Sequence, residues 1–267
     1  PATLSALCDF WGKPTGHLEL AEEICYDGTP SHSERKWAAE NGWVAREFTV
    51  TWDSAVALLD AGVPFTLSTS EATSGHLQAV IGYDARRGTL KIRDPYQRHS
   101  GDGIAKTLLE SQRSHGPRGM ALVPIADRTR IDSLELPDAS LWDRLHQLDA
   151  ALIAHDRSAA EAIYREMHAD SSDHRITHDA RSRLATYDAN PTERLTALER
   201  LVEQFPNDER LQLARIAGLR ELTRREDRLA AYREVYARQK VSPIFWQYYA
   251  QELVSDARER PLALQLL

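Results

Sequence analysis

The chain has 267 residues, of which 42% are hydrophobic and 27% charged, and its net charge is −7. This composition describes a globular protein long enough for two domains of ordinary size. The negative charge and the lack of a basic block argue against nucleic-acid binding. The sequence contains no run of 18 apolar residues, so no segment is predicted to span a membrane.

The two cysteines, Cys8 and Cys25, are too few for a disulfide framework, and no Cys/His cluster has zinc spacing. We therefore predict no metal and no cofactor. A reducing compartment is the default for such a chain, which makes the cytoplasm the default localisation. Because the chain begins at Pro1 rather than Met, removal of a signal or leader stays open.

The first 126 residues predict helices followed by strands. Apolar residues spaced along one face, beginning at Leu4, predict a helix from Ala2 onward. Further helices are predicted at 18–25, at 31–40 after a capping box from Ser31 to Glu34, and at 53–61. Strands are predicted at 64–69, 76–83, 89–93 and 120–124, which gives an α+β domain with a mostly antiparallel sheet.

His76 opens one predicted strand and Asp94 closes the next. The residues between these strands, 85–89 with Gly88 among them, are typical of a hairpin turn. A hairpin would bring the His and the Asp together at one edge of the sheet, as a base and its orienting carboxylate are in nucleophilic catalysis. The alternative is an ordinary edge histidine and an Asp-Pro turn.

Polar residues on either side of His76 are candidates for substrate contact. Ser68, Thr69, Ser70, Thr73 and Ser74 predict a polar loop, which either borders the cleft or is a solvated connector. Within and after it, Ser74, Gly75 and Tyr96 are the candidate substrate-binding residues. Gln78 is interpreted as a surface residue of its strand.

The order of these motifs resembles the papain-like cysteine peptidases of the bacterial double-glycine leader (bacteriocin-processing) family. The resemblance is carried by Pro1–Leu4 at a helix start, Gly62–Phe65, Gly75-His76, Gly82–Asp84 and Arg93–Pro95, and it covers about residues 1–125. It implies a papain-like fold and hydrolysis of a peptide or protein substrate. It also implies that His76 is the general base and that Asp94 orients it.

The family's nucleophile is a Cys at the N-terminus of the first helix, where free N–H groups favour a thiolate and later bind the oxyanion. By this resemblance the Cys is expected about two residues upstream of Pro1, outside this chain, as is the oxyanion-hole Gln. Cys8 lies in the apolar stripe of its helix and Cys25 at a helix C-terminus, so both are interpreted as structural.

The composition changes near residue 127, and residues 127–138 are predicted to link a first domain, 1–126, to a second, 139–267. In the second domain, Ile163-Tyr164-x-x-Met167 recurs 34 residues later at Ala197 and again at Ala231. This period is that of tetratricopeptide repeats, although other helix-pair solenoids share it. First helices of the pairs are predicted at 141–155, 177–188, 209–222 and 244–254, and further repeats are expected beyond Leu267.

The helical repeats predict a surface that binds a protein partner. Arg220, Arg224, Arg225 and Arg228 are candidates for contact with acidic partners, or else form a solvated face with the interleaved acidic residues. Two hypotheses follow for the whole chain. The first is a thiol peptidase whose repeats recruit the substrate, with acyl transfer as a variant of the same chemistry; the alternative is a catalytically inactive module that binds peptides or partner proteins.

Overall fold

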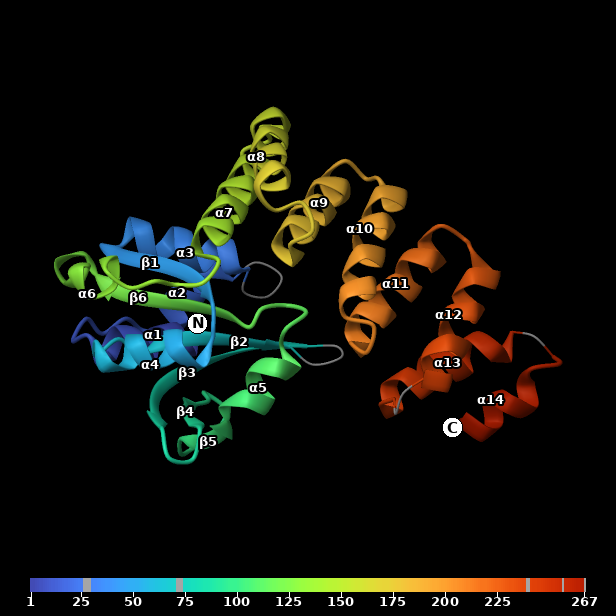
Figure 1. The fold of residues 1–267 in the computed structure, drawn as a ribbon, viewed down its shortest axis with the longest axis horizontal. Coiled ribbons are helices and arrows are strands. Elements are labelled where there is room, and N and C mark those ends of the chain that lie inside the picture. The colour runs from blue at the N-terminus through green and yellow to red at the C-terminus, as the bar shows by residue number, and fades with distance from the viewer. Residues whose placement is uncertain (26–29, 71–73, 239–240, 256, 267) are drawn as a thin grey trace. The chain divides into compact units, whose positions relative to one another are not determined.

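The computed structural model describes residues 1–25, 30–70, 74–238, 241–255 and 257–266. Contacts divide the chain into two compact units, residues 1–70 with 74–156 and residues 157–267. The first unit contains a sheet and helices, whereas the described residues of the second form helices only (Figure 1). The predicted fold class, an α+β domain followed by an all-α region, is confirmed.

The N-terminal helices lie where the sequence predicts them. In the first of them, Leu4, Leu7 and Cys8 are buried along one face. The fourth begins with a capping box in which the side chains of Thr51 and Ser54 bond each other's backbone N–H groups. The four helices are α1 (Ala2–Phe10), α2 (His17–Ile24), α3 (Ser31–Glu40) and α4 (Trp52–Asp60).

The capping box predicted at the start of α3 is wrong. Pro30 is the N-cap residue, so Ser31 lies one position inside the helix and is not its N-cap. Glu34, which was expected to complete the box, is instead buried and directed at Arg118, with 3.7 Å between the carboxylate and the guanidinium. A charged partner 84 residues away therefore outweighs the local motif.

A six-stranded antiparallel sheet forms the centre of the first unit, with the order β1-β6-β2-β3-β4-β5. Four strands agree with the prediction to within two residues, and two were missed: one carries Arg46 and Glu47 at its centre, and the other contains two glycines. The strands are β1 (Trp43–Thr49), β2 (Phe65–Ser70), β3 (Gly75–Asp84), β4 (Thr89–Arg93), β5 (Gly101–Ile104) and β6 (Arg118–Pro124).

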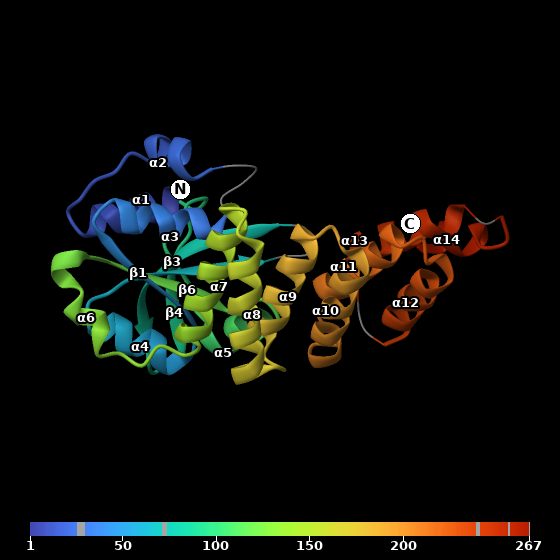
Figure 2. The same cartoon turned by 90° about the horizontal axis from the view of Figure 1, so that it is seen from above.

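The two faces of the sheet bury separate cores. Helices α1 to α3 cover one face, where Ala79, Met120 and Leu122 lie under them. On the other face, α4 packs with α5 (Ala105–Ser111) and α6 (Thr129–Asp132) over residues such as Val80 and Phe65. Figure 2 shows the helices of the two layers on opposite sides of the strands. Adjacent residues 79 and 80 point into different cores, as the alternation of a strand requires.

Helix α7 (Ala139–Ile153) belongs by its contacts to the first unit. Trp142 Nε1 donates to Thr49 Oγ1 of β1 at 3.2 Å, and the helix packs on that strand. Residues 127–138, the predicted linker, contain part of the short 3₁₀ helix η1 (Ile125–Asp127) and all of α6. The division of the chain into domains 1–126 and 139–267 stays a prediction.

The same helix-ending structure recurs every 34 residues, after α7 and after two of the helices that follow it. His155, Ala189 and Thr223 all have a positive φ. At each, the next residue's N–H bonds a carbonyl five residues back, as in Asn190 to Ala185 at 2.8 Å, which is the helix-ending Schellman pattern. The remaining helices are α8 (Arg157–Ser171), α9 (Arg175–Tyr187), α10 (Pro191–Gln204), α11 (Glu209–Glu221), α12 (Arg225–Arg238), α13 (Pro243–Val254) and α14 (Arg260–Leu266).

Residues at the repeated apolar positions are mostly buried, among them Met167, Ala197, Leu201 and Ala231. One part of the predicted Arg-rich face is wrong, because Arg228 is buried. Its guanidinium pairs with the Glu252 carboxylate, and the Nε–Oε2 distance is 2.8 Å. The structure therefore shows the 34-residue period in its helix ends and in its buried apolar positions. The assignment of this period to tetratricopeptide repeats stays a prediction.

Candidate functional site

The structure brings His76 and Asp94 together. His76 is the second residue of β3, Asp94 directly follows β4, and Nε2 of the imidazole lies 3.0 Å from Oδ1 of the carboxylate. The two atoms lie within hydrogen-bonding distance, but their geometry is not that of a well-aligned hydrogen bond. Such alignment often improves only when substrate binds. Because Nε2 faces the carboxylate, Nδ1 is the nitrogen left to face a nucleophile.

A β-bulge at Ile81 explains why these two side chains share a face. Near the turn, Gly82 pairs with Lys91, but beyond the bulge Val80 pairs with Ile92. Continuing this shifted register places Asp94 opposite Gln78, and residues opposite each other project from the same face of the sheet. His76 is two residues from Gln78 on the same strand, so it projects from that face as well. Without the extra residue, Asp94 would lie opposite Ala79 and project from the other face.

Two further groups hold the Asp94 carboxylate. Gln78 Nε2 donates to Oδ2 at 2.8 Å, and the backbone N–H of Tyr96 donates to Oδ1 at 2.8 Å. Partial burial alone would raise the pKa of Asp94, but these hydrogen bonds, together with His76, outweigh it and lower the pKa. The interpretation of Gln78 as a surface residue is therefore wrong. Its position two residues after His76 was the available signal, because it puts both side chains on one face.

The imidazole is also covered by an aromatic ring. Tyr96 stacks on His76 with 5.1 Å between ring centroids and 22° between planes, while 85% of Tyr96 is exposed. This arrangement limits rotation of the imidazole. Tyr96 therefore both borders the site and supports its base.

A cavity of about 670 Å³ adjoins His76. Among its lining residues are the first three of the chain, so the N-terminus of α1 and the imidazole share one space. Thr3 Oγ1 donates to the Leu77 carbonyl at 2.6 Å and ties α1 to β3. The lining residues are Pro1, Ala2, Thr3, Glu34, Ser68, Thr69, Ser70, Gly75, His76, Leu77, Pro95, Tyr96 and Arg118.

The predicted substrate-binding residues are only partly placed at this cavity. Gly75 and Tyr96 line it, whereas Ser74 does not. The predicted polar loop is also different, because Ser68, Thr69 and Ser70 form the end of β2 and face the cavity from a strand. Thr73, which was predicted to belong to the same loop, lies outside the described residues.

Neither cysteine lines the cavity. Cys8 is fully buried in the core under α1, and burial raises its pKa to about 11. Cys25 is exposed at the C-cap of α2.

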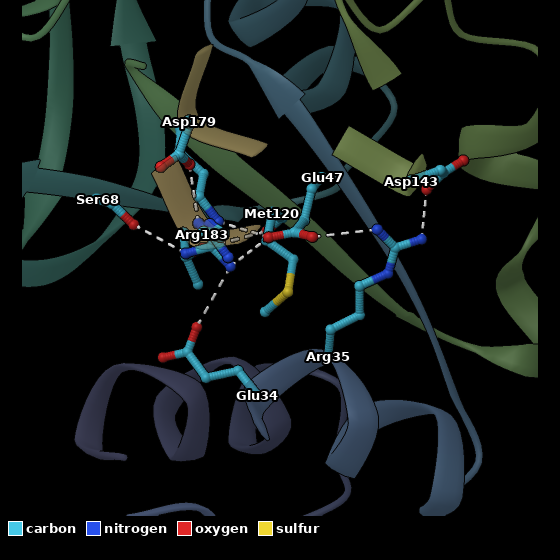
Figure 3. A network of polar contacts seen from close by, with 10 residues as sticks. Glu34, Arg35, Glu47, Ser68, Met120, Asp143, Asp179 and Arg183 are labelled. Carbon is cyan, nitrogen blue, oxygen red and sulfur yellow. Dashed lines mark hydrogen bonds and ion pairs between the residues drawn. The ribbon is translucent and has the colours of Figure 1, made fainter. Parts of the chain in front are cut away.

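A buried cluster of charges, which the sequence did not reveal, contributes Glu34 and Arg118 to the lining of the cavity. Arg35 extends from α3 to the Glu47 carboxylate on β1 (Figure 3), and Glu34 of the same helix is directed at Arg118. Arg118 pairs with the Glu47 carboxylate and donates to Ser68 Oγ at 3.1 Å. Arg35 lies 3.1 Å from Glu47 on the other side. The polar contacts link α3, β1, β2 and β6 beside the site.

The two buried carboxylates of this cluster respond differently to their surroundings. Burial raises the pKa of Glu34 because Arg118 only partly compensates for the lost solvent. Burial would also raise the pKa of Glu47, but the guanidinium groups of Arg118 and Arg35 outweigh it and lower the pKa. Glu47 is therefore the carboxylate that the two arginines hold in its charged form.

The described residues contain no group of three or more His, Cys, Asp or Glu side chains placed to hold a metal ion. None of the helices described is long and apolar enough to cross a membrane.

Comparison with known proteins supports the class indicated by this geometry. Residues 1–114 match the model of the "Peptidase_C39 like family". The matched segment is less than half of the chain and contains α1, His76 and Asp94, so this part of the chain is similar to a family of cysteine peptidase-like domains. A search of curated proteins found no match to the chain.

Proposed function

We propose that the N-terminal domain carries out papain-type thiol acyl transfer, with hydrolysis of a peptide bond as its outcome. The observation that carries this proposal is that His76, paired with Asp94, and the N-terminus of α1 line one cavity. His76 is the general base, and Asp94 fixes the orientation of its ring. The nucleophile is a Cys at the start of α1, just upstream of Pro1.

The reaction then follows from the placement of these groups. His76 takes the thiol proton, and the thiolate attacks the carbonyl carbon of the peptide bond. The first-turn N–H groups of α1 stabilise the negative oxygen of the tetrahedral intermediate. Protonated His76 gives its proton to the leaving amine, which leaves a thioester. Water, deprotonated by His76, cleaves the thioester, or an amine takes the acyl group instead. The helical repeats recruit the protein substrate.

The alternative is a catalytically inactive module that grips a peptide in the same cavity. One observation favours it for residues 1–267: neither cysteine lines the cavity, and Cys8 is held as a thiol by burial. The chain as printed is accordingly expected not to cleave peptides by the thiol route.

The two functions are distinguished by restoring a thiol at the start of α1. We expect a chain extended by Cys-Gly before Pro1 to cleave a fluorogenic peptide mixture, and iodoacetamide or His76→Ala to abolish this cleavage. A Ser-Gly extension is the matched control. If the Cys-Gly chain is inactive but peptide binding in the cavity is detected and is lost in Tyr96→Ala, the binding module is the better description.

A further inference from the structure

A second cavity lies in the helical unit, far along the chain from the candidate peptidase site. It has a volume of about 460 Å³, within the usual range for small-ligand sites. Helices α10, α11 and α12 contribute to it. Its lining residues are Glu199, Val202, Glu203, Pro206, Gln212, Arg215, Glu234 and Arg238.

Gln212 supplies a buried hydrogen-bond acceptor to this groove. Only 2% of the residue is exposed, and its Nε2 donates to the Pro206 carbonyl at 2.8 Å. That bond fixes the orientation of the amide, so Oε1 is the remaining acceptor. Within the described residues, Oε1 has no hydrogen-bond partner although it is buried. An unpaired buried acceptor is costly and uncommon in native proteins.

Arg215 supplies a donor beside that acceptor. It lies three residues after Gln212 on α11, so the two side chains are neighbours on one face of the helix. Its Nε is buried and, in the described part of the chain, has no hydrogen-bond partner. Glu234 holds the other end of the guanidinium, with Nη1 3.5 Å from Oε2. The donor is therefore positioned but not used.

An adjacent acceptor and donor on one wall match one particular group of a ligand. In an extended peptide, the N–H and C=O of a single residue point to the same side and can form two bonds to one neighbour. The acceptor and donor of the groove can therefore pair with the N–H and C=O of one peptide residue, as the backbone of a neighbouring strand does in a sheet. Its N–H would donate to Gln212 Oε1, and its carbonyl would accept from Arg215 Nε.

The charges of the groove indicate the side chain of that residue. Three glutamates and two arginines line it. Glu234 is paired with both Arg215 and Arg238, and Glu203 with Arg200. Glu199 is half-buried and, among the described residues, takes part in no ion pair. A carboxylate left in this state favours a cationic partner.

We propose that this groove binds an extended peptide segment through the backbone of one lysine or arginine residue, with Gln212 and Arg215 clamping its N–H and C=O and Glu199 receiving its charge. This inference deepens the protein-binding role proposed for the helical repeats and rests on it. The partner is thus defined as a basic, extended peptide.

The test uses the ¹⁵N-labelled full chain and N-acetyl-lysine N-methylamide, which contains one complete backbone residue. We expect the Arg215 Nε–H signal to shift and saturate. An ester analogue, in which oxygen replaces the lysine N–H, should bind about tenfold more weakly because Gln212 is left unpaired. The norleucine analogue should bind about threefold more weakly because it lacks the charge.

Variants separate recognition from folding. Glu199→Gln should remove the preference for lysine over norleucine, whereas Glu226→Gln, an exposed residue of α12 outside the groove, should keep it. Gln212→Leu should abolish the shift of Arg215, provided that its melting curve shows a folded chain.

The proposal is overturned if the Arg215 signal does not move, or if the ester analogue binds as tightly as the amide. Either result leaves the peptidase chemistry untouched, because cleavage of the fluorogenic peptides is measured separately. Binding of a partner elsewhere on the repeats would then keep the proposed function without this groove.

Discussion

The orienting carboxylate of the candidate site depends on Gln78, an uncharged side chain on the same strand as His76. Gln78 and the Tyr96 N–H occupy different oxygens of Asp94, so the carboxylate cannot rotate freely while His76 contacts it. The amide of Gln78 carries no charge and takes no part in proton transfer. Its contribution is to keep Asp94 ionised and fixed, which makes it a positioning residue.

We predict that Gln78→Leu raises the pKa of Asp94, because a hydrogen bond to the charged form is lost. A carboxyl whose pKa is lowered by folding stabilises the folded state at any pH above its pKa in the unfolded chain. This stabilisation is lost as the pH falls through the pKa of the folded state. The variant should therefore lose stability at pH 7 and little at low pH. The measurement is a ¹³C NMR titration of the Asp94 carboxyl together with urea unfolding at both pH values.

Gln97→Leu is the matched control, since Gln97 is exposed and its described hydrogen bonds involve its backbone alone: its N–H donates to the Asp94 carbonyl and its carbonyl accepts from Arg93. It should leave the pKa of Asp94 unchanged. An unchanged pKa in Gln78→Leu as well would mean that the backbone N–H of Tyr96 and the imidazole are sufficient to hold the carboxylate.

At the scale of strands and helices, local signals were predictable and the features that depend on distant partners were not. The hairpin that joins His76 to Asp94 was predicted because its turn residues are adjacent in sequence, and Gly88 adopts a positive φ there. The bulge at Ile81 has no such signature, because Ile is an ordinary strand residue. Strand β1 was not predicted because a charged residue such as Glu47 is expected at the surface. Its burial depends on the pairing with Arg118, which is 71 positions away in the sequence.

We predict that Arg118→Met lowers the free energy of unfolding by about 3–5 kcal/mol at pH 7, because Glu47 and Glu34 are left buried with less compensating charge. The pKa of Glu47 is lowered by folding, so its stabilising effect is present at neutral pH and lost as the pH falls through the folded value. The difference between variant and parent should therefore narrow in acid. Urea unfolding between pH 7 and pH 4 measures it.

The comparison variant is Arg128→Met, whose guanidinium is 60% exposed and pairs with Asp132 one turn later. Such pairs contribute about 0–1 kcal/mol, so this change should be nearly neutral at either pH. A similar loss in both variants would show that the cluster beside the cavity is no more important to folding than a surface ion pair.

On the scale of the whole chain, the two compact units have separate cores. Strands β1 to β6 and their helices bury one set of apolar residues, and α10 to α14 bury another. The described contacts of the His76 and Asp94 side chains are made with residues of the first unit. The geometry of the candidate site is therefore expected to be independent of how well the helical repeats pack.

Tyr232 allows this independence to be tested. It is 1% exposed and lies between two rings, stacked on Tyr249 at 5.0 Å and edge-on to Phe245 at 5.4 Å. Tyr232→Ala should lower the stability of the helical unit by about 3–5 kcal/mol, the usual cost of removing a buried ring, while the pKa of Asp94 stays unchanged. Tyr236→Ala, which removes a ring that is 46% exposed, should cost much less. Far-UV circular dichroism in urea follows the helices, and the Asp94 carboxyl signal reports on the site. A shifted Asp94 titration in Tyr232→Ala would mean that the repeats help to shape the candidate active site, because the described contacts of that side chain would then be insufficient to fix it.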